Sequence, residues 1–426
     1  MAVAILFGLL AVLLAIGVPV GFALAASSLA TVWYLDLPTA VFVQQTVAGA
    51  NTTSLIAIPL FVFAGEMMMR GGISERLISF AASLVGRMRG GLGQVNVVAS
   101  LLFGGVSGSA IADVSAIGGT MIPQMVKRGF DRDFAVNVSV TAALVALLVP
   151  PSHNLILYSA SAGGSISIAD LFAAGVIPAA LMTLTLMLTT WIIAKRRGYA
   201  TEPFPGFGEV LRRLVAALPG LLLVALIFFG IRAGIFTAVE SASIAVAYAL
   251  LVTGIVYRQL TWANFLETCA GAVRTTGLIV FVIGTAAAFG WLLAYLQVPS
   301  AAVDAMTAFA SSKTAVLLML IVSLLILGTF MDLAPLIIIC TPIFLPVARA
   351  FGIDPVHFGI ILILNAGIGL ITPPVGSVLF VGTAIGKISV AQALRTIWPF
   401  YLAALAVLLI VTFVPALSLW LPALLR

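Results

Sequence analysis

Four short stretches of the chain place glycine, proline and oxygen-bearing side chains inside otherwise apolar runs. They cover residues 105–113, 148–154, 328–332 and 371–377. Glycine and proline interrupt helices, and unwound backbone within a membrane is tolerated where it lines a cavity in the protein. Hydroxyl, amide and carbonyl oxygens are also the ligands of hard cations, and Na⁺ takes several of them. These stretches therefore predict pockets for a monovalent cation.

We expect the first two stretches to form one pocket and the last two to form a related second pocket. The predicted residues of these sodium and substrate pockets are Ser107, Gly108, Ser109, Asp113, Pro150, Ser152, Asn154, Gly328, Thr329, Asp332, Thr372, Pro373, Gly376 and Ser377. Helices that begin beside Pro151 and Pro374 would direct the positive ends of their dipoles inward, and carboxylates bind at such ends. The combination is typical of a site that takes an organic anion together with sodium.

Several of these residues also have a purely structural interpretation. Proline pairs in membrane helices are often simple kinks, although both pairs here have Ser or Thr beside them. Asp113 and Asp332 are either ligands or N-caps that accept hydrogen bonds from backbone amides. Glu66 and Glu240 lie in apolar segments, where an ionisable group is a functional candidate, but packing between helices with hydrogen bonds is the favoured interpretation. His153 lies within a break, and we assign it no role.

The elements that must position these residues are apolar helices. The chain has 426 residues, of which 62% are hydrophobic and 8% are charged, whereas soluble domains carry about 25% charged residues. A soluble globular protein is therefore excluded. The two cysteines, Cys269 and Cys340, and the two histidines show no metal-binding spacing. The net charge of +6 is confined to short loops, where it indicates orientation in the membrane and not nucleic-acid binding.

The order of apolar runs repeats in the second half of the chain. Three pairs of identical residues are each separated by 223 positions: Pro123 and Pro346, Asp131 and Asp354, and Pro150 and Pro373. Chance alignment of common residues is the alternative.

We expect an all-α polytopic fold of two inverted repeats, with each repeat holding a re-entrant hairpin and a broken helix. The first repeat covers 1–195, with its hairpin at about 92–126 and its broken helix at about 134–162. The second covers 214–426, with the hairpin at about 315–348 and the broken helix at about 357–386. A cytoplasmic linker, 196–213, joins them.

The positive charges predict how the chain crosses the membrane. If each half has five crossing helices and one hairpin, and the linker is cytoplasmic, 16 of the 20 Lys and Arg residues fall inside and 4 fall outside. This bias follows the positive-inside rule. Both termini are then periplasmic. We expect the first apolar run to be a retained helix and not a signal peptide, because no Lys or Arg precedes it.

Four motifs resemble a known family. They are IPLFVFAGE at 58–66, SGSAIADV at 107–114, GIFT at 234–237 with Glu240 following, and ITPPVG at 371–376. They resemble the large membrane subunit of tripartite ATP-independent periplasmic (TRAP) transporters, and the chain is similar to the dicarboxylate- and sialic-acid-type permeases over nearly its whole length. Ala238-Val239 departs from the family pattern, since many members carry a proline there.

The resemblance implies a multi-pass protein of the bacterial inner membrane that imports an organic acid with Na⁺ as coupling ion. It implies an elevator motion, in which hairpins and broken helices move against a scaffold that includes residues 2–34 and 214–257. It also implies two partners, a small four-helix membrane subunit and a periplasmic substrate-binding protein. A stand-alone sodium–carboxylate symporter of the same superfamily is the alternative.

Two other classes fit the sequence poorly. An enzyme is not expected, because the chain lacks a His-Glu-x-x-His motif, a paired aspartate motif and a plausibly spaced Ser–His dyad. A channel is disfavoured because no ring of charge and no continuous polar stripe is present. No ATP-binding loop is present, so an ion gradient must supply the energy.

Overall fold

The computed structural model describes residues 1–51, 53–199, 201, 203–309 and 312–425, and within these residues it contains helices and no strand. The first half comprises α1 (Ala2–Ala15), α2 (Val20–Tyr34), α3 (Thr39–Ala50), η1 (Thr53–Ile56), α4 (Ala57–Arg70), α5 (Ile73–Val85), α6 (Gly91–Ser107), α7 (Ala110–Asp113), η2 (Val114–Gly118), α8 (Gly119–Lys127), α9 (Arg132–Ala142), η3 (Val145–Leu147), α10 (His153–Ser161) and α11 (Ile168–Arg197). The second half comprises α12 (Phe207–Arg232), α13 (Ala238–Leu251), η4 (Val252–Val256), α14 (Trp262–Tyr295), α15 (Val298–Phe309), α16 (Lys313–Phe330), α17 (Leu333–Ala350), α18 (Pro355–Leu370), α19 (Ser377–Gly386), α20 (Val390–Thr396), α21 (Trp398–Phe413) and α22 (Ala416–Leu424).

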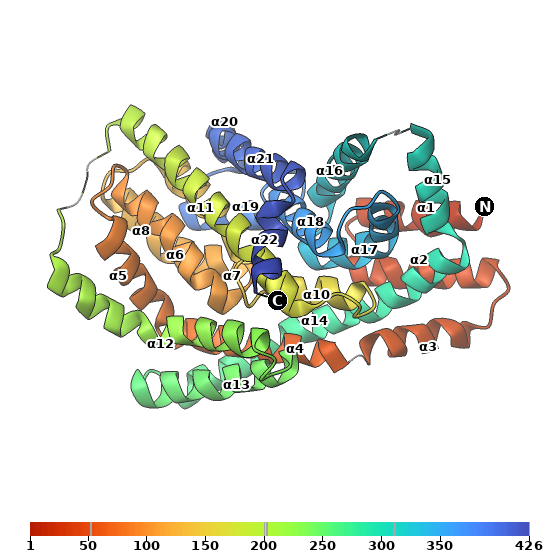
Figure 1. Cartoon of the computed structure of the whole chain (residues 1–426), viewed down its shortest axis with the longest axis horizontal. Coiled ribbons are helices and arrows are strands. Elements are labelled where there is room, and N and C mark those ends of the chain that lie inside the picture. Colours follow the sequence, from red (N-terminus) through yellow and green to blue (C-terminus); the bar gives the residue numbers. More distant parts are fainter. Residues whose placement is uncertain (52, 200, 202, 310–311, 426) are drawn as a thin grey trace.

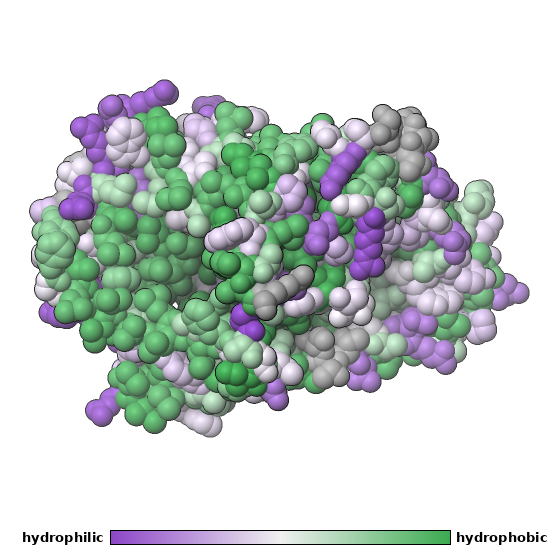
Figure 2. Space-filling view, viewed as in Figure 1, coloured by the Kyte–Doolittle hydropathy of each residue, from purple (hydrophilic) through white to green (hydrophobic). Residues whose placement is uncertain are grey.

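Many of these helices are suited to a lipid environment. Among the described residues, 6 helices are long and apolar enough to cross a membrane, and up to 8 spans result if two bent helix pairs each count as one. Apolar side chains cover much of the left and centre of the molecular face in Figure 2, whereas hydrophilic residues lie at the upper left edge and over the right-hand part. Lipid cannot hydrogen-bond to backbone, so a helix that satisfies its own amides suits this surface. The chain is an all-helical, multi-pass membrane protein.

The predicted breaks coincide with helix ends. Helix α6 ends at Ser107 and α7 begins at Ala110, while α16 ends at Phe330 and α17 begins at Leu333. The two Pro-Pro pairs fall between η3 and α10 and between α18 and α19. Local chemistry explains several of these ends. Ser109 caps α7 through its side chain, and Asp354 caps α18, which has Pro355 in its first turn.

Other elements differ from the sequence-based expectation. Helix α14 runs without interruption for 34 residues. This segment contains no proline, and glycine alone lowers helix stability without breaking the hydrogen-bond ladder. Helix α11 continues to Arg197 and α12 begins at Phe207. The non-helical part of the predicted linker is thus confined to 198–206, of which residues 200 and 202 lie outside the described residues.

Hairpin arms pack closely on broken helices in both halves. In the first half, a Cβ added at Gly104 of α6 would lie 2.6 Å from Cα of Ala146 in η3. In the second half, Gly369 of α18 lies directly against the backbone of Gly328 in α16. Such close backbone approach is possible only where no side chain intervenes. Glycine thus brings each hairpin against the broken helix of its own half.

The interrupted helices lie against a row of unbroken ones. In Figure 1, α13, α4 and α14 run side by side along the lower edge, with α10 and α17 above them. Helix α14 contacts α2, α3, α4 and α17, so it bridges the N-terminal helices and the second hairpin. This arrangement places the ends of both hairpins over the middle of the row formed by α4 and α14.

Candidate functional site

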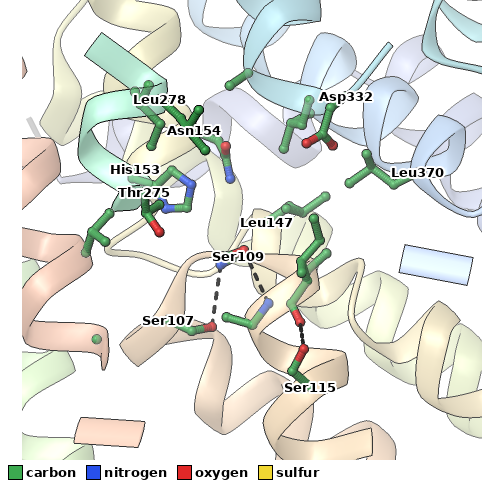
Figure 3. A pocket seen from close by; sticks show the side chains of 18 of the residues that line it. Ser107, Ser109, Ser115, Leu147, His153, Asn154, Thr275, Leu278, Asp332 and Leu370 are labelled. Carbon is green, nitrogen blue, oxygen red and sulfur yellow. Dashed lines mark hydrogen bonds between the residues drawn. The ribbon is translucent and has the colours of Figure 1, made fainter. Parts of the chain in front are cut away.

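The ends of the two hairpins open into a single cavity of about 540 Å³. Its walls come from α4, the α6–α7 turn, α10, α14 and the start of α17. The polar side chains that line it are Glu66, Ser107, Ser109, Ser115, His153, Asn154, Thr275 and Asp332. Figure 3 shows Asn154 and Asp332 on two sides of this space, with Ser107 and Ser109 on the turn below them. Oxygen-bearing side chains from both halves of the chain therefore line the same cavity.

The first hairpin end is shaped by a serine–glycine–serine turn. Gly108 adopts a left-handed conformation, with φ of +59°, which a residue with a Cβ rarely adopts. Ser109 accepts a hydrogen bond of 3.4 Å from the amide of Ala112, and the amide of Ser109 donates to Oγ of Ser107 at 3.5 Å. Both hydroxyls act as acceptors here, so the hydrogen of each remains free to point into the cavity.

The first broken helix is tied to this turn. Nδ2 of Asn154 donates to the carbonyl oxygen of Gly108 at 2.9 Å, and Asn154 is buried. Oγ of Ser152 donates to the carbonyl oxygen of Leu147 at 2.8 Å, across the break at Pro150-Pro151. Unwound backbone needs such partners in a low-dielectric interior. The two hydrogen bonds fix the break and hold it against the hairpin end.

The second hairpin end is tied to its own broken helix in a similar way. The amide of Val375 donates to the carbonyl oxygen of Thr329 at 3.1 Å, and Oγ of Ser377 donates to Oδ1 of Asp332 at 3.2 Å. Oγ1 of Thr372 donates to the carbonyl oxygen of Ile368 at 2.7 Å. The hydroxyl of Tyr401 donates to the carbonyl oxygen of Ile371, so α21 supports this break.

The structure places only some of the predicted pocket residues on the cavity. Ser107, Ser109, Asn154 and Asp332 line it. The remaining predicted residues are not among the lining side chains, and instead shape the turns and breaks behind it: Gly108, Asp113, Pro150, Ser152, Gly328, Thr329, Thr372, Pro373, Gly376 and Ser377. Two related pockets were expected, whereas the two hairpin ends share this cavity. The assignment of individual residues to sodium stays a prediction.

The two aspartates have different surroundings. Asp113 is fully buried, and its Oδ2 accepts a 2.7 Å hydrogen bond from Ser100 on α6, while Oδ1 has no partner among the described residues. Asp332 lies at the start of α17 and faces the cavity. Neither side chain makes a hydrogen bond that caps its helix. The capping interpretation therefore does not describe the structure.

Glu66 and α14 contribute to the site in a way that sequence reasoning missed. Packing with hydrogen bonds was the favoured interpretation for both Glu66 and Glu240. Glu240 does hydrogen-bond to Thr237 in a capping box and is exposed. Glu66 instead lines the cavity, as does Thr275 of α14. The polar pair Thr275-Thr276, within an otherwise apolar run, is the sequence feature that could have indicated a place for α14 in the cavity wall.

The comparison with known proteins decides the family. The profile of the family described as "Tripartite ATP-independent periplasmic transporter, DctM component" matches residues 7–417. The chain belongs to this family. It is 38% identical to the sialic acid TRAP transporter large permease protein SiaM of Vibrio cholerae, with 98% of this chain and 97% of that protein covered. It is 35% identical to the 2,3-diketo-L-gulonate TRAP transporter large permease protein YiaN of Escherichia coli, with 98% of each covered.

The fold also occurs in a solved structure. The TRAP permease fold of this chain matches the crystal structure of the YdaH transporter of Alcanivorax borkumensis with a TM-score of 0.61, covering 90% of this chain and 88% of that one. The sequence identity is 14%, so the match concerns the fold alone. Membership of the TRAP family and the apolar helices agree that this chain is a membrane-embedded transport component.

Proposed function

We propose that this TRAP large permease imports an organic acid, such as a dicarboxylate, a sialic acid or a similar carboxylate, by sodium-coupled symport. The observation that carries the proposal is that both hairpin ends meet in one cavity, into which hydroxyl, amide and carboxylate side chains of both halves project among apolar ones. Hydroxyl and carbonyl oxygens at interrupted helices are suited to Na⁺, and the free hydroxyl hydrogens of Ser107 and Ser109 are suited to a carboxylate. No ATP-binding loop is present, so the sodium gradient supplies the energy.

Two sodium sites are proposed, one at each hairpin end. The first uses Ser107, Ser109 and Asn154 with neighbouring carbonyls, and the second uses Thr329, Thr372 and Ser377 with theirs. The hydrogen bonds from Asn154 to Gly108 and from Val375 to Thr329 support this proposal, because they bring a hairpin end and a helix break together in each half. A hard cation needs several oxygens from such neighbouring segments.

The motion is proposed to be an elevator. The hairpins and broken helices would move together, because unwound backbone stays satisfied only while its hydrogen-bond partners accompany it. The close packing of Gly104 on Ala146 and of Gly369 on Gly328 supports a single moving unit. The proposed scaffold includes α1, α2, α12 and α13. A Cβ added at Gly105 of the first hairpin would lie 2.8 Å from Cγ2 of Val224 on α12, which marks where the two parts touch.

The proposed topology is supported by the side-chain contacts between loops. Arg197 binds Asp131 and Asp133, each at 2.9 Å, and the end of α11 and the loop before α9 that hold them are both cytoplasmic in the proposed topology. Arg232 binds Asp170 at 3.0 Å on the side assigned to the periplasm. Further long-range contacts of cationic side chains join segments that the proposed topology puts on one side: Arg70 with Glu267, Arg132 with Gly386, Arg213 with Ser79, Lys313 with Gly352 and Arg349 with Ser165. Both termini are accordingly proposed to be periplasmic, in the inner membrane.

Two partners complete the proposed transporter. The relatives are named large permeases, and this word implies a smaller membrane subunit beside the large one. We assign that role to a small four-helix membrane protein. A periplasmic binding protein would deliver the acid to the outer face of the cavity.

Uptake by the reconstituted transporter tests the proposal. The chain, its small subunit and the acid-loaded binding protein are combined with proteoliposomes, and labelled acid is counted inside. Uptake should require an inward sodium gradient and should stop when a sodium ionophore collapses it. Uptake driven by ATP, or by a proton gradient in the absence of sodium, would contradict the proposal. Full uptake without the binding protein would favour a stand-alone symporter.

A further inference from the structure

Arg232, the last residue of α12, binds two other helices through its guanidinium. Nη1 donates to Oδ1 of Asp170, in the first turn of α11, at 3.0 Å. Nη2 donates to the carbonyl oxygen of Pro422 in α22 at 3.4 Å. Both charged side chains are largely buried, and an ion pair that is shielded from water is stronger than an exposed one. Arg232 therefore ties the end of α12 to α11 and α22 together.

Helix α11 packs as a part of the proposed moving unit. Gly175 of α11 lies directly against the backbone of Leu148 at the first helix break. Nε2 of Gln94, on the hairpin arm α6, donates to the carbonyl oxygen of Met187 in α11 at 2.9 Å. Helix α22 packs along α11 and also contacts α18 (Figure 1). The ion pair thus joins the moving unit to α12, which belongs to the proposed scaffold.

The GIFT motif at 234–237 makes the end of α12 rigid. The amides of Ile235 and Phe236 both donate to the carbonyl oxygen of Gly230, at 3.1 and 3.2 Å. The ring of Phe236 covers this glycine, since a Cβ added there would lie 2.6 Å from it. The residues that follow form the capping box of α13. This motif, which takes no part in the cavity, therefore fixes the position of Arg232 on the scaffold.

The ion pair is also suited to open. Asp170 lies in the first turn of its helix and Arg232 in the last turn of its own, so each charge is favoured by the dipole of the helix that carries it. A buried charge that loses its partner without other compensation is strongly unfavourable. Here each charge keeps part of its compensation, and both lie at helix ends that the proposed topology puts near the periplasmic surface. Separation of the pair is therefore less costly than in a closed core.

We propose that Arg232 and Asp170 form a latch, which holds the moving unit to the scaffold in the state described here and opens when the unit moves. This inference rests on the proposed function, because it requires motion of one part past the other. Helix α12 touches the moving unit again where Val224 packs on Gly105, but apolar contacts are non-directional and can be replaced during sliding. The ion pair has a fixed geometry, so movement of α11 along α12 must break it.

Single-molecule fluorescence measures the ratio of the latched state to the moved state. In a Cys269→Ser, Cys340→Ser background, cysteines at Asp36 and Ala350 carry the two dyes. Both positions are exposed, the first directly after the scaffold helix α2 and the second at the end of α17 in the moving unit. The permease and its small subunit are held in nanodiscs with sodium. The energy transfer between the dyes then reports the distance between the two parts.

Variants of both partners assign the ratio to the latch. Arg232→Met removes the charge and keeps a long, unbranched side chain, and it should lower the ratio of latched to moved state by about fivefold or more. Asp170→Asn should act in the same direction from the opposite helix. The double variant should lower the ratio no further than the stronger single variant, because both changes remove the same interaction. A general loss of stability would not shift the balance between two folded states in this way.

Arg212→Ala is the matched control on the same helix. Arg212 pairs with Glu209 of α12 itself and is 78% exposed, so this variant should keep the wild-type ratio. A wild-type ratio in both Arg232→Met and Asp170→Asn would overturn the inference, as would additive effects in the double variant or an equal shift in Arg212→Ala.

Failure of the latch and failure of the proposed function are distinguishable. Two states whose ratio does not respond to Arg232 would remove the latch and leave the proposed motion intact. A single state under all conditions, with or without sodium and acid, would overturn both the latch and the elevator motion. Sodium-driven uptake of the acid that the binding protein delivers tests the proposed transport activity separately.

Discussion

Nδ2 of Asn154 donates a 2.9 Å hydrogen bond to the carbonyl oxygen of Gly108. This contact joins the start of α10 to the end of the first hairpin, two segments that are separated by the whole of α8 and α9. Because Gly108 is in the left-handed conformation, its carbonyl is not used by a regular helix and needs another partner. The same contact places the Asn154 side chain on the cavity beside Ser109. The same hydrogen bond therefore holds the first hairpin end against α10 and positions Asn154 in the cavity.

Replacement of Ser109 or Ser377 by alanine should weaken sodium coupling. Each change removes one hydroxyl ligand from a proposed site, so the sodium concentration for half-maximal uptake should rise by about tenfold, the equivalent of roughly 1.4 kcal/mol. Ser243→Ala is the matched control, because Ser243 is an exposed α13 residue whose Oγ donates to the carbonyl oxygen of Val239. Wild-type sodium dependence in both site variants would show that the sites lie elsewhere.

Gly369→Ala should destabilise the second half of the molecule. A Cβ at this position would overlap the backbone of Gly328 on α16, and overpacking of this kind costs typically about 1–3 kcal/mol. The thermal unfolding midpoint in detergent should fall. Gly290→Ala on α14 serves as control, since a Cβ there meets nothing within 4 Å. Equal midpoints for the two variants would contradict the close packing of hairpin and broken helix.

The ion pair between Arg232 and Asp170 should stabilise the packing of α12 against the start of α11. Both side chains are largely buried, at 14% and 12% exposure, and Arg232 also donates to the carbonyl oxygen of Pro422 near the C-terminus. Arg232→Ala should lower the free energy of unfolding by about 2 kcal/mol, between the values for exposed and buried pairs. Arg212→Ala, at a residue 78% exposed, should change it little. An unfolding curve for Arg232→Ala that overlays the wild type would refute this contribution.

Labelling of single cysteines tests the topology. Cys269 and Cys340 are first replaced by serine, and a cysteine is introduced at Thr201 in the linker or at Gly164 between α10 and α11. An impermeant maleimide added to cells with a permeabilised outer membrane should label the Gly164→Cys variant and leave the Thr201→Cys variant unlabelled, because the linker is predicted to be cytoplasmic. Strong labelling at 201 in intact inner membranes would reverse the assignment.

The sequence predicted the breaks of the fold because their causes are local. Gly108 requires a left-handed conformation, Ser109 caps a helix, and proline pairs end helices wherever they occur. Charge bias along the loops likewise depends on composition alone. These features predicted where the helices are interrupted; that the interrupted pairs are re-entrant hairpins stays a prediction, since α16 and α17 are each long and apolar enough to span a membrane.

The sequence did not predict the shared cavity or the position of Glu66 on it, because both depend on contacts between residues far apart in the chain. The meeting of both hairpin ends in one cavity follows from how the two halves pack, and no local pattern encodes it. Glu66 had a similar sequence context to Glu240, yet one lines the cavity and the other caps α13 in an exposed position. Helix α14 continues through four glycines because its neighbours α2, α3 and α4 support it along its length.

Sodium-driven uptake by crosslinked protein tests the central claim, that hairpins and broken helices carry the acid past a fixed scaffold. In a Cys269→Ser, Cys340→Ser background, cysteines at Gly105 and Val224 join the first hairpin to α12, where a Cβ at Gly105 would lie 2.8 Å from the Val224 side chain. Cysteines at Gly118 and Ser139 join η2 to α9 within the moving unit, where the Cβ–Cβ distance of 3.5 Å suits a disulfide. Oxidation should abolish uptake in the 105–224 pair, reduction should restore it, and the 118–139 pair should transport in both states. Full uptake by the oxidised 105–224 pair would contradict the account.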